Sequence, residues 1–516
     1  MIVTIYSSAL SGMDAYKIAV EVSVTRGMGY QITGLPDESI KESLTRIAIA
    51  IDRMGYYMPR TKLVINLAPA DIRKYGTAFD LAITTGILLA SEQVFDLGKL
   101  ADYCIAGETG LDGKIYPVRG ALCMTCQAKR DGFRGIIVPA CNAPEASLVK
   151  GIEVYAVNHV QELLDFITAD CAMEPYKNTR NRTTTIVTKD EPDFKDVKGQ
   201  QNAKRAMEIA AAGGHNSLLI GGPGIGKTML AKRLAGILPP MTAAESLETT
   251  KIYSLIHQSE PVHGLITTRP FRNPHHTSSD VALAGGGSYP LPGEISLAHN
   301  GVLFLDELPE FKRSAIEVLR QPLEERKVLI ARAKMSVQYP ASFMLLAAMN
   351  PCLCGYYGHP SRPCTCSKRA MWWYRRRISG PLLERIDLHV EAESVPLTEL
   401  METVPAGECS ATIKQRVVQA RRLQTERFKD QEVVYCNAQM PDAMIDTHCN
   451  VEVSARKFLL KNIDQLQLSA RSYSRILKVA RTIADLKSSK LIELPHVAEA
   501  IHFRSLDKPF VFKKDK

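Results

Sequence analysis

The feature that most constrains the fold of this chain is a glycine-rich turn near its middle. Residues 221–228 read GGPGIGKT and match the pattern G-x-x-x-x-G-K-[ST]. An apolar, strand-like segment, Ser217–Ile220, precedes the turn, and a helical pattern at 229–238 follows it. This order places backbone N–H groups at the positive end of a helix dipole, where phosphates bind. The sequence therefore predicts a parallel α/β domain that binds a nucleotide.

The residues of this turn have separate predicted roles. We expect Lys227 to reach the β- and γ-phosphates of ATP, and Thr228 to bind Mg²⁺. The backbone of the remaining residues should wrap the phosphates. These residues are Gly221, Gly222, Pro223, Gly224, Ile225 and Gly226.

Two further apolar segments end in polar residues. Val302–Leu305 is followed by Asp306 and Glu307, which is the Walker B pattern. We expect Asp306 to hold Mg²⁺ and Glu307 to polarise the attacking water. The alternative is an ordinary strand-to-helix turn with a capping acid. The segment 342–348 leads to Asn350, which fits a residue that positions water beside the phosphates.

Pattern changes along the 516 residues predict a multi-domain α/β protein. In residues 1–170, strand-like and helix-like segments are mixed. Residues 171–192 are polar, rich in threonine and typical of a linker. Strands and helices alternate regularly in 193–396, and helices dominate 397–516.

Charge is unevenly distributed over these regions. The chain has a net charge of +9, yet residues 1–170 hold 16 Lys and Arg against 19 Asp and Glu. A basic remainder suggests a polyanionic partner such as nucleic acid, although a solvated surface explains it equally well.

The longest apolar run, 81–90, is about half of what a membrane span needs, and no secretory signal opens the chain. We therefore expect a cytoplasmic protein without membrane segments.

Four of the twelve cysteines lie close together in the sequence. Cys352, Cys354, Cys364 and Cys366 form C-x-C-x9-C-x-C in a segment rich in glycine and proline. Four thiolates on a loop suit a structural, tetrahedral Zn²⁺ ion. The alternatives are free cysteines or a redox pair, and His359 could replace one ligand. Cys123 and Cys126 form a separate C-x-x-C in a predicted helix, where core packing is expected.

A basic and aromatic segment follows the cysteines directly. Residues 368–377 read KRAMWWYRRR, with both tryptophans of the chain and no acid. Basic side chains neutralise phosphates and aromatic rings stack on bases, so a nucleic-acid surface is one interpretation. A subunit interface is the other, because Trp, Tyr and Arg also dominate such interfaces. The candidate contact residues are Lys368, Arg369, Trp372, Trp373, Arg375, Arg376 and Arg377.

These motifs, in this order, resemble an AAA+ ATPase. The segment 379–388, SGPLLERIDL, resembles the arginine-bearing segment of the magnesium-chelatase and replicative-helicase branch. That resemblance implies that Arg385 acts in trans as an arginine finger on a neighbour's γ-phosphate, and that Arg471 is the sensor-2 arginine. Without the resemblance, each arginine would be read as an ordinary surface ion pair.

Two further features fit that branch. The 78 positions from Thr228 to Asp306 leave room for an insertion, which contains His275 and His276. Adjacent histidines rarely bind one ion together, so we expect a loop role for them. The segment 327–339 is typical of a β-hairpin. In related hexamers such a hairpin lines the pore, which would bring Arg332 and Lys334 to DNA.

Residues 1–170 resemble the catalytic domain of Lon proteases. The similarity lies in 65–71, 74–81 and 107–114. Lon proteases use a serine activated by a lysine. The serine would fall at Ala78 and the lysine at Leu122 or Met124, and none of these side chains can act as a nucleophile or a base. We therefore predict a fold without protease activity that caps an ATPase ring.

The whole chain resembles the YifB/ComM family of magnesium-chelatase-like competence proteins. This resemblance implies a homo-hexameric, ATP-driven DNA motor that promotes branch migration in homologous recombination, notably of DNA taken up in natural transformation. Its expected partner is single-stranded, forked or branched DNA. The alternatives are a chelatase-type motor, which the Lon-like domain and zinc loop oppose, and an ATP-dependent protease, which the missing serine and lysine oppose.

Overall fold

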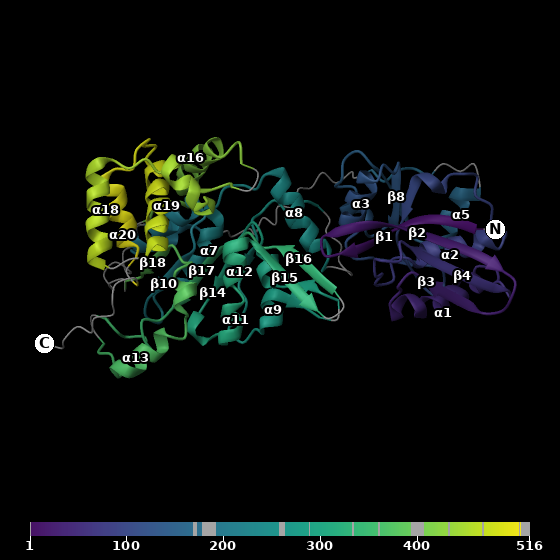
Figure 1. Ribbon diagram of the computed structural model, residues 1–516, viewed down its shortest axis with the longest axis horizontal. Helices are drawn as coiled ribbons and strands as arrows, with labels where there is room; N and C mark the ends of the chain where they lie inside the picture. The colour runs from purple at the N-terminus through teal and green to yellow at the C-terminus, as the bar shows by residue number, and fades with distance from the viewer. Residues whose placement is uncertain are drawn as a thin grey trace.

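The protein was analysed as a computed structural model. It describes residues 2–168, 173–177, 192–256, 264–287, 289–332, 335–359, 362–393, 407–431, 434–466, 469–504 and 506. Most of the predicted linker and Lys334 lie outside these residues. The described parts form an elongated molecule in which an N-terminal unit lies at one end and the C-terminal helices at the other (Figure 1). The sheet that carries the glycine-rich turn lies between them.

The N-terminal unit is built on a seven-stranded mixed sheet in the order β3-β4-β2-β1-β5-β8-β9. Its two long strands pair antiparallel from Ile2 opposite Ser23 to Ser11 opposite Asp14. The strands are β1 Ile2–Ser11, β2 Asp14–Thr25, β3 Tyr30–Thr33, β4 Lys62–Ala68, β5 Tyr103–Ile105, β8 Gly135–Pro139 and β9 Glu153–Val157.

Helices cover both faces of this sheet. All residues of α2 (Asp80–Ala90) are buried, because its sequence is apolar on every side. Asp37 caps α1 (Glu38–Arg53) by accepting from the backbone N–H of Ile40 at 3.0 Å. Cys123 on α3 (Ala121–Arg130) is buried, and burial raises the pKa of its thiol to about 12. It packs in the core as predicted, whereas Cys126 is partly exposed. The remaining elements are α4 Ala143–Ala146, α5 Val160–Thr168, β6 Glu108–Thr109 and β7 Ile115–Tyr116.

The middle unit is a five-stranded parallel sheet in the order β11-β14-β17-β10-β18. Every residue of β10, β14 and β17 is buried, as expected for parallel strands covered by helices on both faces. The predicted parallel α/β architecture is thus confirmed. The strands are β10 Ser217–Ile220, β11 Phe271–Arg272, β14 Val302–Leu305, β17 Met344–Met349 and β18 Leu388–Glu391.

Helices and short strands surround this sheet. Two long helices, α6 Gln201–Gly213 and α7 Lys227–Ile237, pack into the same apolar core as the sheet. The others are α8 Ala243–Ser254, α9 Asp280–Ala284, β12 Gly285–Gly286, β13 Leu291–Pro292, α10 Glu294–Leu297, α11 Arg313–Glu317, α12 Arg320–Glu325, β15 Lys327–Arg332, β16 Met335–Pro340, α13 Lys368–Arg375 and α14 Gly380–Leu383.

The C-terminal helices form a bundle that packs on α6. Helices dominate this region, as the sequence predicts; they are α16 Ser410–Arg427, α17 Ile445–His448, α18 Val453–Leu466, α19 Ala470–Leu486 and α20 Leu494–His502. The basic helix α16 uses much of its charge within the chain: Arg416 pairs with Glu208, and Arg427 pairs with Asp485 at 2.6 Å. No helix in the described part of the chain has the length and apolar character needed to cross a bilayer.

The N-terminal unit contacts the segment inserted between α7 and β14. The backbone N–H of Gly120 donates to the carbonyl of Ser254 at 3.0 Å. The predicted hairpin is present as β15 and β16. Val337 of β16 packs closely on Gly12, because a Cβ atom added to Gly12 would lie 2.5 Å from Cγ1 of Val337. The middle of the hairpin is therefore part of the interface with the N-terminal unit, while Arg332 near its tip is exposed.

Candidate nucleotide site and cysteine cluster

The glycine-rich turn connects β10 to α7 at the carboxyl end of the sheet. Gly224 and Gly226 have φ values of +75° and +93°, a region that favours glycine. The N–H of Gly221 donates to the carbonyl of Met349 at 3.1 Å, which joins the turn to β17. Because α7 begins at Lys227, the turn lies at the positive end of that helix, as a phosphate site requires.

Lys227 and Asn350 meet at this turn, although 123 positions separate them in the sequence. The Lys227 ammonium donates to the carbonyls of Gly221 and Gly222 at 2.7 and 2.8 Å, and to Oδ1 of Asn350 at 3.1 Å. Burial lowers the pKa of Lys227, while Asp306 and Glu307 act in the opposite direction. The polar end of β17 thus lies beside the residue expected to bind the terminal phosphates.

Thr228 and Asp306 form a pair of oxygen ligands. The Thr228 hydroxyl donates to Oδ2 of Asp306 at 2.7 Å. The other carboxylate oxygen accepts from the N–H of Glu307 at 3.0 Å. Hydroxyl and carboxylate oxygens are the ligands that Mg²⁺ prefers, usually together with phosphate oxygens and water. The donor set therefore fits Mg²⁺ bound to a nucleotide in the turn.

Glu307 has a neighbour that the sequence did not reveal. The residue adopts a φ of +51°, and its carboxylate is half exposed and faces Nδ1 of His276 at 3.5 Å. His276 follows β11, and β11 lies next to β14 in the sheet. The sequence could not predict this contact, because it depends on the strand order, which brings the ends of β11 and β14 together. The prediction of a loop role for His276 was therefore incomplete.

Arg385 and Arg471, the predicted arginine finger and sensor-2 arginine, contact acidic residues of their own chain. Arg385 is buried, donates to the carbonyl of Pro381 at 2.6 Å and pairs with Glu324. This differs from the exposed position that a finger would need, so Arg385 would have to exchange Glu324 for a phosphate. Arg471 is exposed and lies 3.4 Å from Glu384.

The four cysteines of 352–366 converge. Their sulfur atoms all lie within 4.8 Å of one another, and three of the Sγ–Sγ distances are 3.4, 3.5 and 3.6 Å. Sulfurs bound to a tetrahedral zinc ion at about 2.3 Å are about 3.8 Å apart. The N–H groups of Tyr357 and Cys354 donate to Sγ of Cys352 and Cys366, both at 3.3 Å. Such donors stabilise metal-bound thiolates, so the cluster fits Zn²⁺.

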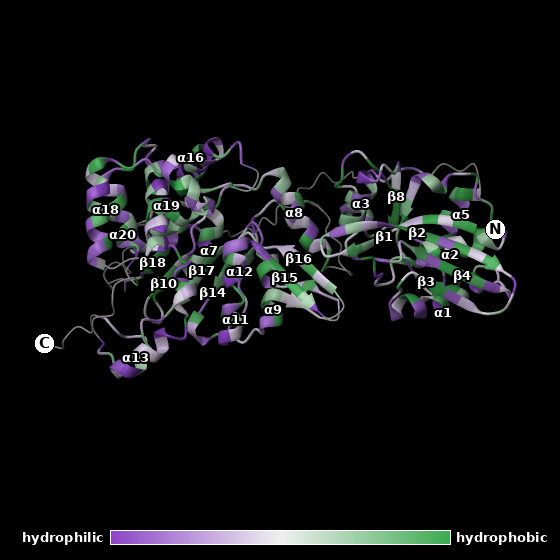
Figure 2. Cartoon of the chain, in the orientation of Figure 1, coloured by the Kyte–Doolittle hydropathy of each residue, from purple (hydrophilic) through white to green (hydrophobic). Residues whose placement is uncertain are grey.

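The basic and aromatic segment forms α13, which carries hydrophilic residues at the edge of the molecule (Figure 2). Trp372 and Trp373 are 42% and 58% exposed, and the Arg376 guanidinium lies 4.2 Å from the ring centre of Trp372. Arg377 instead pairs with Glu310 at 2.8 Å, and Arg375 lies against the ring of Tyr357. Lys368 and Arg369 are exposed. All these residues except Arg375 are thus exposed, and Arg375 and Arg377 also contact other parts of their own chain.

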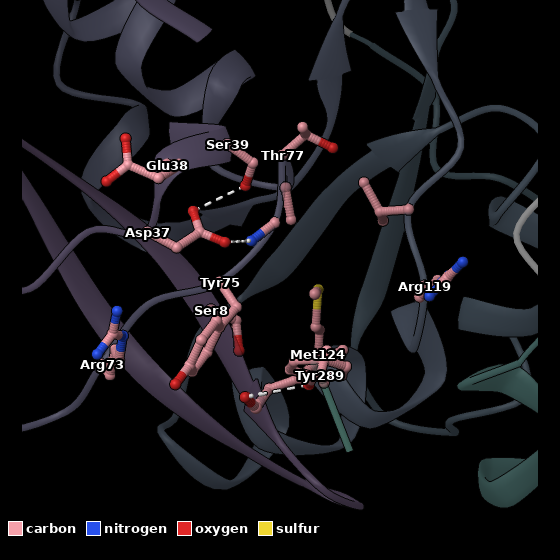
Figure 3. A pocket seen from close by; sticks show the side chains of 14 residues that line it. Ser8, Asp37, Glu38, Ser39, Arg73, Tyr75, Thr77, Arg119, Met124 and Tyr289 are labelled. Carbon is pink, nitrogen blue, oxygen red and sulfur yellow. Dashed lines mark hydrogen bonds between the residues drawn. The ribbon is translucent and has the colours of Figure 1, made fainter. Parts of the chain in front are cut away.

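A cavity of about 530 Å³ lies where the Lon resemblance would put the catalytic residues (Figure 3). Thr77, Ala78 and Met124 line it, and Tyr289 of the middle unit closes one side. Leu122, the other candidate for the lysine position, is fully buried. Neither Ala78 nor Met124 can serve as nucleophile or base.

Family models cover most of the chain. The model described as magnesium chelatase, subunit ChlI, matches residues 193–400, and the model for the C-terminal part of that subunit matches 407–504. A third model, described as subunit ChlI of Mg-chelatase, matches residues 20–142. The matches at 193–400 and 407–504 include the nucleotide site, the cysteine cluster and the C-terminal helices.

Curated relatives match the chain nearly end to end. The uncharacterized protein YifB of Escherichia coli is 42% identical over 98% of this chain and 97% of its own. The competence protein ComM of Haemophilus influenzae is 41% identical over 97% of both chains. The magnesium-chelatase 67 kDa subunit of Chlorobaculum parvum is 27% identical, but over 31% of this chain and 23% of its own. The chain therefore belongs to the YifB/ComM family of magnesium-chelatase-like AAA+ proteins, a family that implies ATP and Mg²⁺ as cofactors.

Proposed function

We propose that this protein is an ATP-driven DNA motor that promotes branch migration during homologous recombination, including recombination of DNA taken up from outside. The observation that carries the proposal is the complete set of Mg-ATP residues, Lys227, Thr228, Asp306, Glu307 and Asn350, assembled at one edge of the sheet. The name of the Haemophilus relative, a competence protein, supports the link to DNA uptake. The motor acts in the cytoplasm, where ATP and DNA meet.

The proposed DNA surface consists of the exposed residues of α13 and the tip of the β15–β16 hairpin. Trp372 and Trp373 stack on bases, and Lys368, Arg369 and Arg376 neutralise phosphates. Arg332 adds a charge near the hairpin tip, and Lys334, two positions later in the sequence, lies outside the described residues. We assign Arg375 and Arg377 a supporting role, since both bind within the chain.

The active form is a hexamer with nucleotides at the subunit boundaries. Arg385 and Arg471 then act on the nucleotide of a neighbour, and Glu324 and Glu384 hold them until that nucleotide is in reach. The N-terminal unit caps the ring and cleaves no protein. A structural Zn²⁺ ion is held by Cys352, Cys354, Cys364 and Cys366.

A chelatase-type motor is the second candidate, because all three matching family models are named after a magnesium chelatase subunit. Such a motor would hydrolyse ATP in response to a tetrapyrrole and its partner subunits rather than to DNA.

The deciding measurement is steady-state ATP hydrolysis with and without single-stranded and forked DNA. The Glu307→Gln variant, which keeps the size of the side chain but loses the charge, is the blank. The motor proposal expects hydrolysis to rise several-fold with DNA in the natural protein and to stay at background in the variant. Robust hydrolysis that ignores every DNA tested would overturn the proposal and direct attention to tetrapyrroles.

A further inference from the structure

The four-cysteine loop lies directly against the phosphate-binding turn. A Cβ atom placed on Gly355 would lie 2.6 Å from Cδ of Pro223, and one placed on Gly222 would lie 3.1 Å from the carbonyl oxygen of Gly355. Both contacts are closer than side chains normally allow, so the two backbones meet with nothing between them. The cysteine loop is therefore one wall of the turn that is expected to bind the phosphates.

The same loop begins at Asn350, which contacts Lys227. The backbone of Asn350 also lies beside Tyr374, a buried side chain on α13. The start of the loop is thus tied to the nucleotide site on one side and to α13 on the other.

The positions of the cysteines explain how the loop can keep this shape. Cys352 and Cys354 lie next to Asn350 and Gly355, whereas Cys364 and Cys366 lie just before Ser367, whose hydroxyl caps α13. A thiol is a weak hydrogen-bond donor and acceptor, so four thiols alone hold a loop poorly. Zinc supplies four strong bonds and joins the two ends of the loop.

We propose that zinc bound by this cluster holds the wall of the nucleotide site, so that zinc binding and nucleotide binding are thermodynamically coupled. This inference rests on the zinc site proposed above. Coupling is reciprocal: if zinc raises the affinity for nucleotide by a given factor, nucleotide raises the affinity for zinc by the same factor. A purely structural zinc ion far from the nucleotide would show neither effect.

The first test follows zinc rather than activity. The full-length protein is analysed for zinc by mass spectrometry and then equilibrated with a chelator of known zinc affinity, and the zinc that stays bound is measured with and without saturating ADP. We expect one zinc per chain and a Kd for zinc that is about tenfold lower with ADP. Absence of zinc would overturn the zinc site itself. Stoichiometric zinc with the same Kd with and without ADP would overturn the coupling. Neither result depends on whether DNA stimulates hydrolysis.

The second test uses two glycines of the loop that differ in one respect. Gly355 and Gly358 both have a φ of +80°, so alanine strains the backbone equally at either position. A Cβ atom on Gly358 meets no atom within 4 Å, whereas one on Gly355 meets Pro223.

We expect Gly355→Ala and Gly358→Ala to retain zinc, because all four cysteines remain. Gly355→Ala should raise the Kd for a fluorescent ADP analogue about tenfold, and Gly358→Ala should change it less than twofold. Equal Kd values in the two variants would show that the contact with the turn does not matter and would overturn the proposal. Cys366→Ser, compared with Cys141→Ser at an exposed position, should lose zinc and nucleotide affinity together.

Discussion

Lys227 and Glu307, the two side chains on which ATP hydrolysis would depend, are each held by a contact with a distant residue of the sequence. Asn350 fixes the ammonium of Lys227, and His276 faces the carboxylate of Glu307. Both contacts join residues that are far apart in the sequence and meet because their strands are neighbours in the parallel sheet. A carboxylate that polarises water must be aimed, since small misplacements in an active site lower rates strongly. We therefore expect His276 to act as a positioning residue for Glu307.

His276→Ala should lower kcat for ATP hydrolysis about tenfold, which corresponds to ~1.4 kcal/mol of transition-state stabilisation. Nucleotide affinity should stay near that of the natural protein, because His276 has no contact with the turn among the described residues. His275→Ala is the matched control, since His275 bonds to Thr277 instead. Equal losses of kcat in the two variants would refute the assignment.

A buried histidine makes the stability of the middle unit depend on pH. Burial, together with the charges of Arg504 and Arg475, lowers the pKa of His389 to about 3, and Asp387 acts in the opposite direction. An unfolded histidine titrates near pH 6.5. The unfolded state therefore binds more protons between these values, so this contribution to stability is complete above about pH 6.5 and is lost as the pH falls toward 3.

His389→Gln should reduce the slope of the free energy of unfolding against pH by up to ~1.4 kcal/mol per pH unit. Both tryptophans lie in α13, so tryptophan fluorescence reports the thermal unfolding of the middle unit. Between pH 6.5 and 5.5 the Tm of the natural protein should fall about 3 °C more than that of the variant. Parallel curves for the two proteins would contradict this account of His389.

At the scale of elements, α13 is compatible with both interpretations that the sequence left open. Its exposed tryptophans and the Arg376 that lies over Trp372 suit either bases or a second subunit. Its inner face, with Met371 and Tyr374, is buried against the rest of the chain. The helix thus packs one face on its own chain and exposes both tryptophans on the other.

The double variant Trp372→Ala/Trp373→Ala should weaken single-stranded DNA binding at least fivefold, because each stacked base contributes ~1–3 kcal/mol. Fluorescence anisotropy with a labelled oligonucleotide measures this change. Tyr57→Ala, at an exposed aromatic residue of the N-terminal unit, is the control. If α13 is instead a subunit interface, the double variant will dissociate in sedimentation experiments while DNA affinity per subunit is unchanged.

At the scale of the whole molecule, the proposed motor needs more than one copy of the chain. Within one chain, Arg385 and Arg471 pair with acidic residues and have no contact with the phosphate-binding turn in the described structure. The N-terminal unit packs on the inserted segment and on the β15–β16 hairpin, so a movement of the hairpin would also displace that unit. These arrangements fit a ring in which neighbouring chains complete each site.

Mixing experiments test this arrangement. Arg385→Ala and Lys227→Ala should each abolish hydrolysis alone. When the two variants are mixed, some boundaries combine an intact turn from one chain with an intact arginine from the other, so part of the activity should return. No recovery, although mixed oligomers are shown to form, would argue that Arg385 acts within its own chain or only supports the structure through Glu324.

The sequence by itself determined the nucleotide-binding turn, the acidic pair after β14, the order of domains and the cysteine cluster. These features depend on neighbouring residues: local spacing sets strand, turn and helix, and chemistry follows from residue type. The strands at 217–220 and 302–305 were predictable for the same reason.

Only the tertiary structure decided which side chains meet across the sheet. The contacts of His276 with Glu307, of Gly355 with Pro223 and of Arg385 with Glu324 join segments between 31 and 132 positions apart. Such pairs depend on strand order and on the path of loops, and many packings satisfy the same local pattern. The residues of the site could therefore be named from the sequence, while the partners that aim and support them could not.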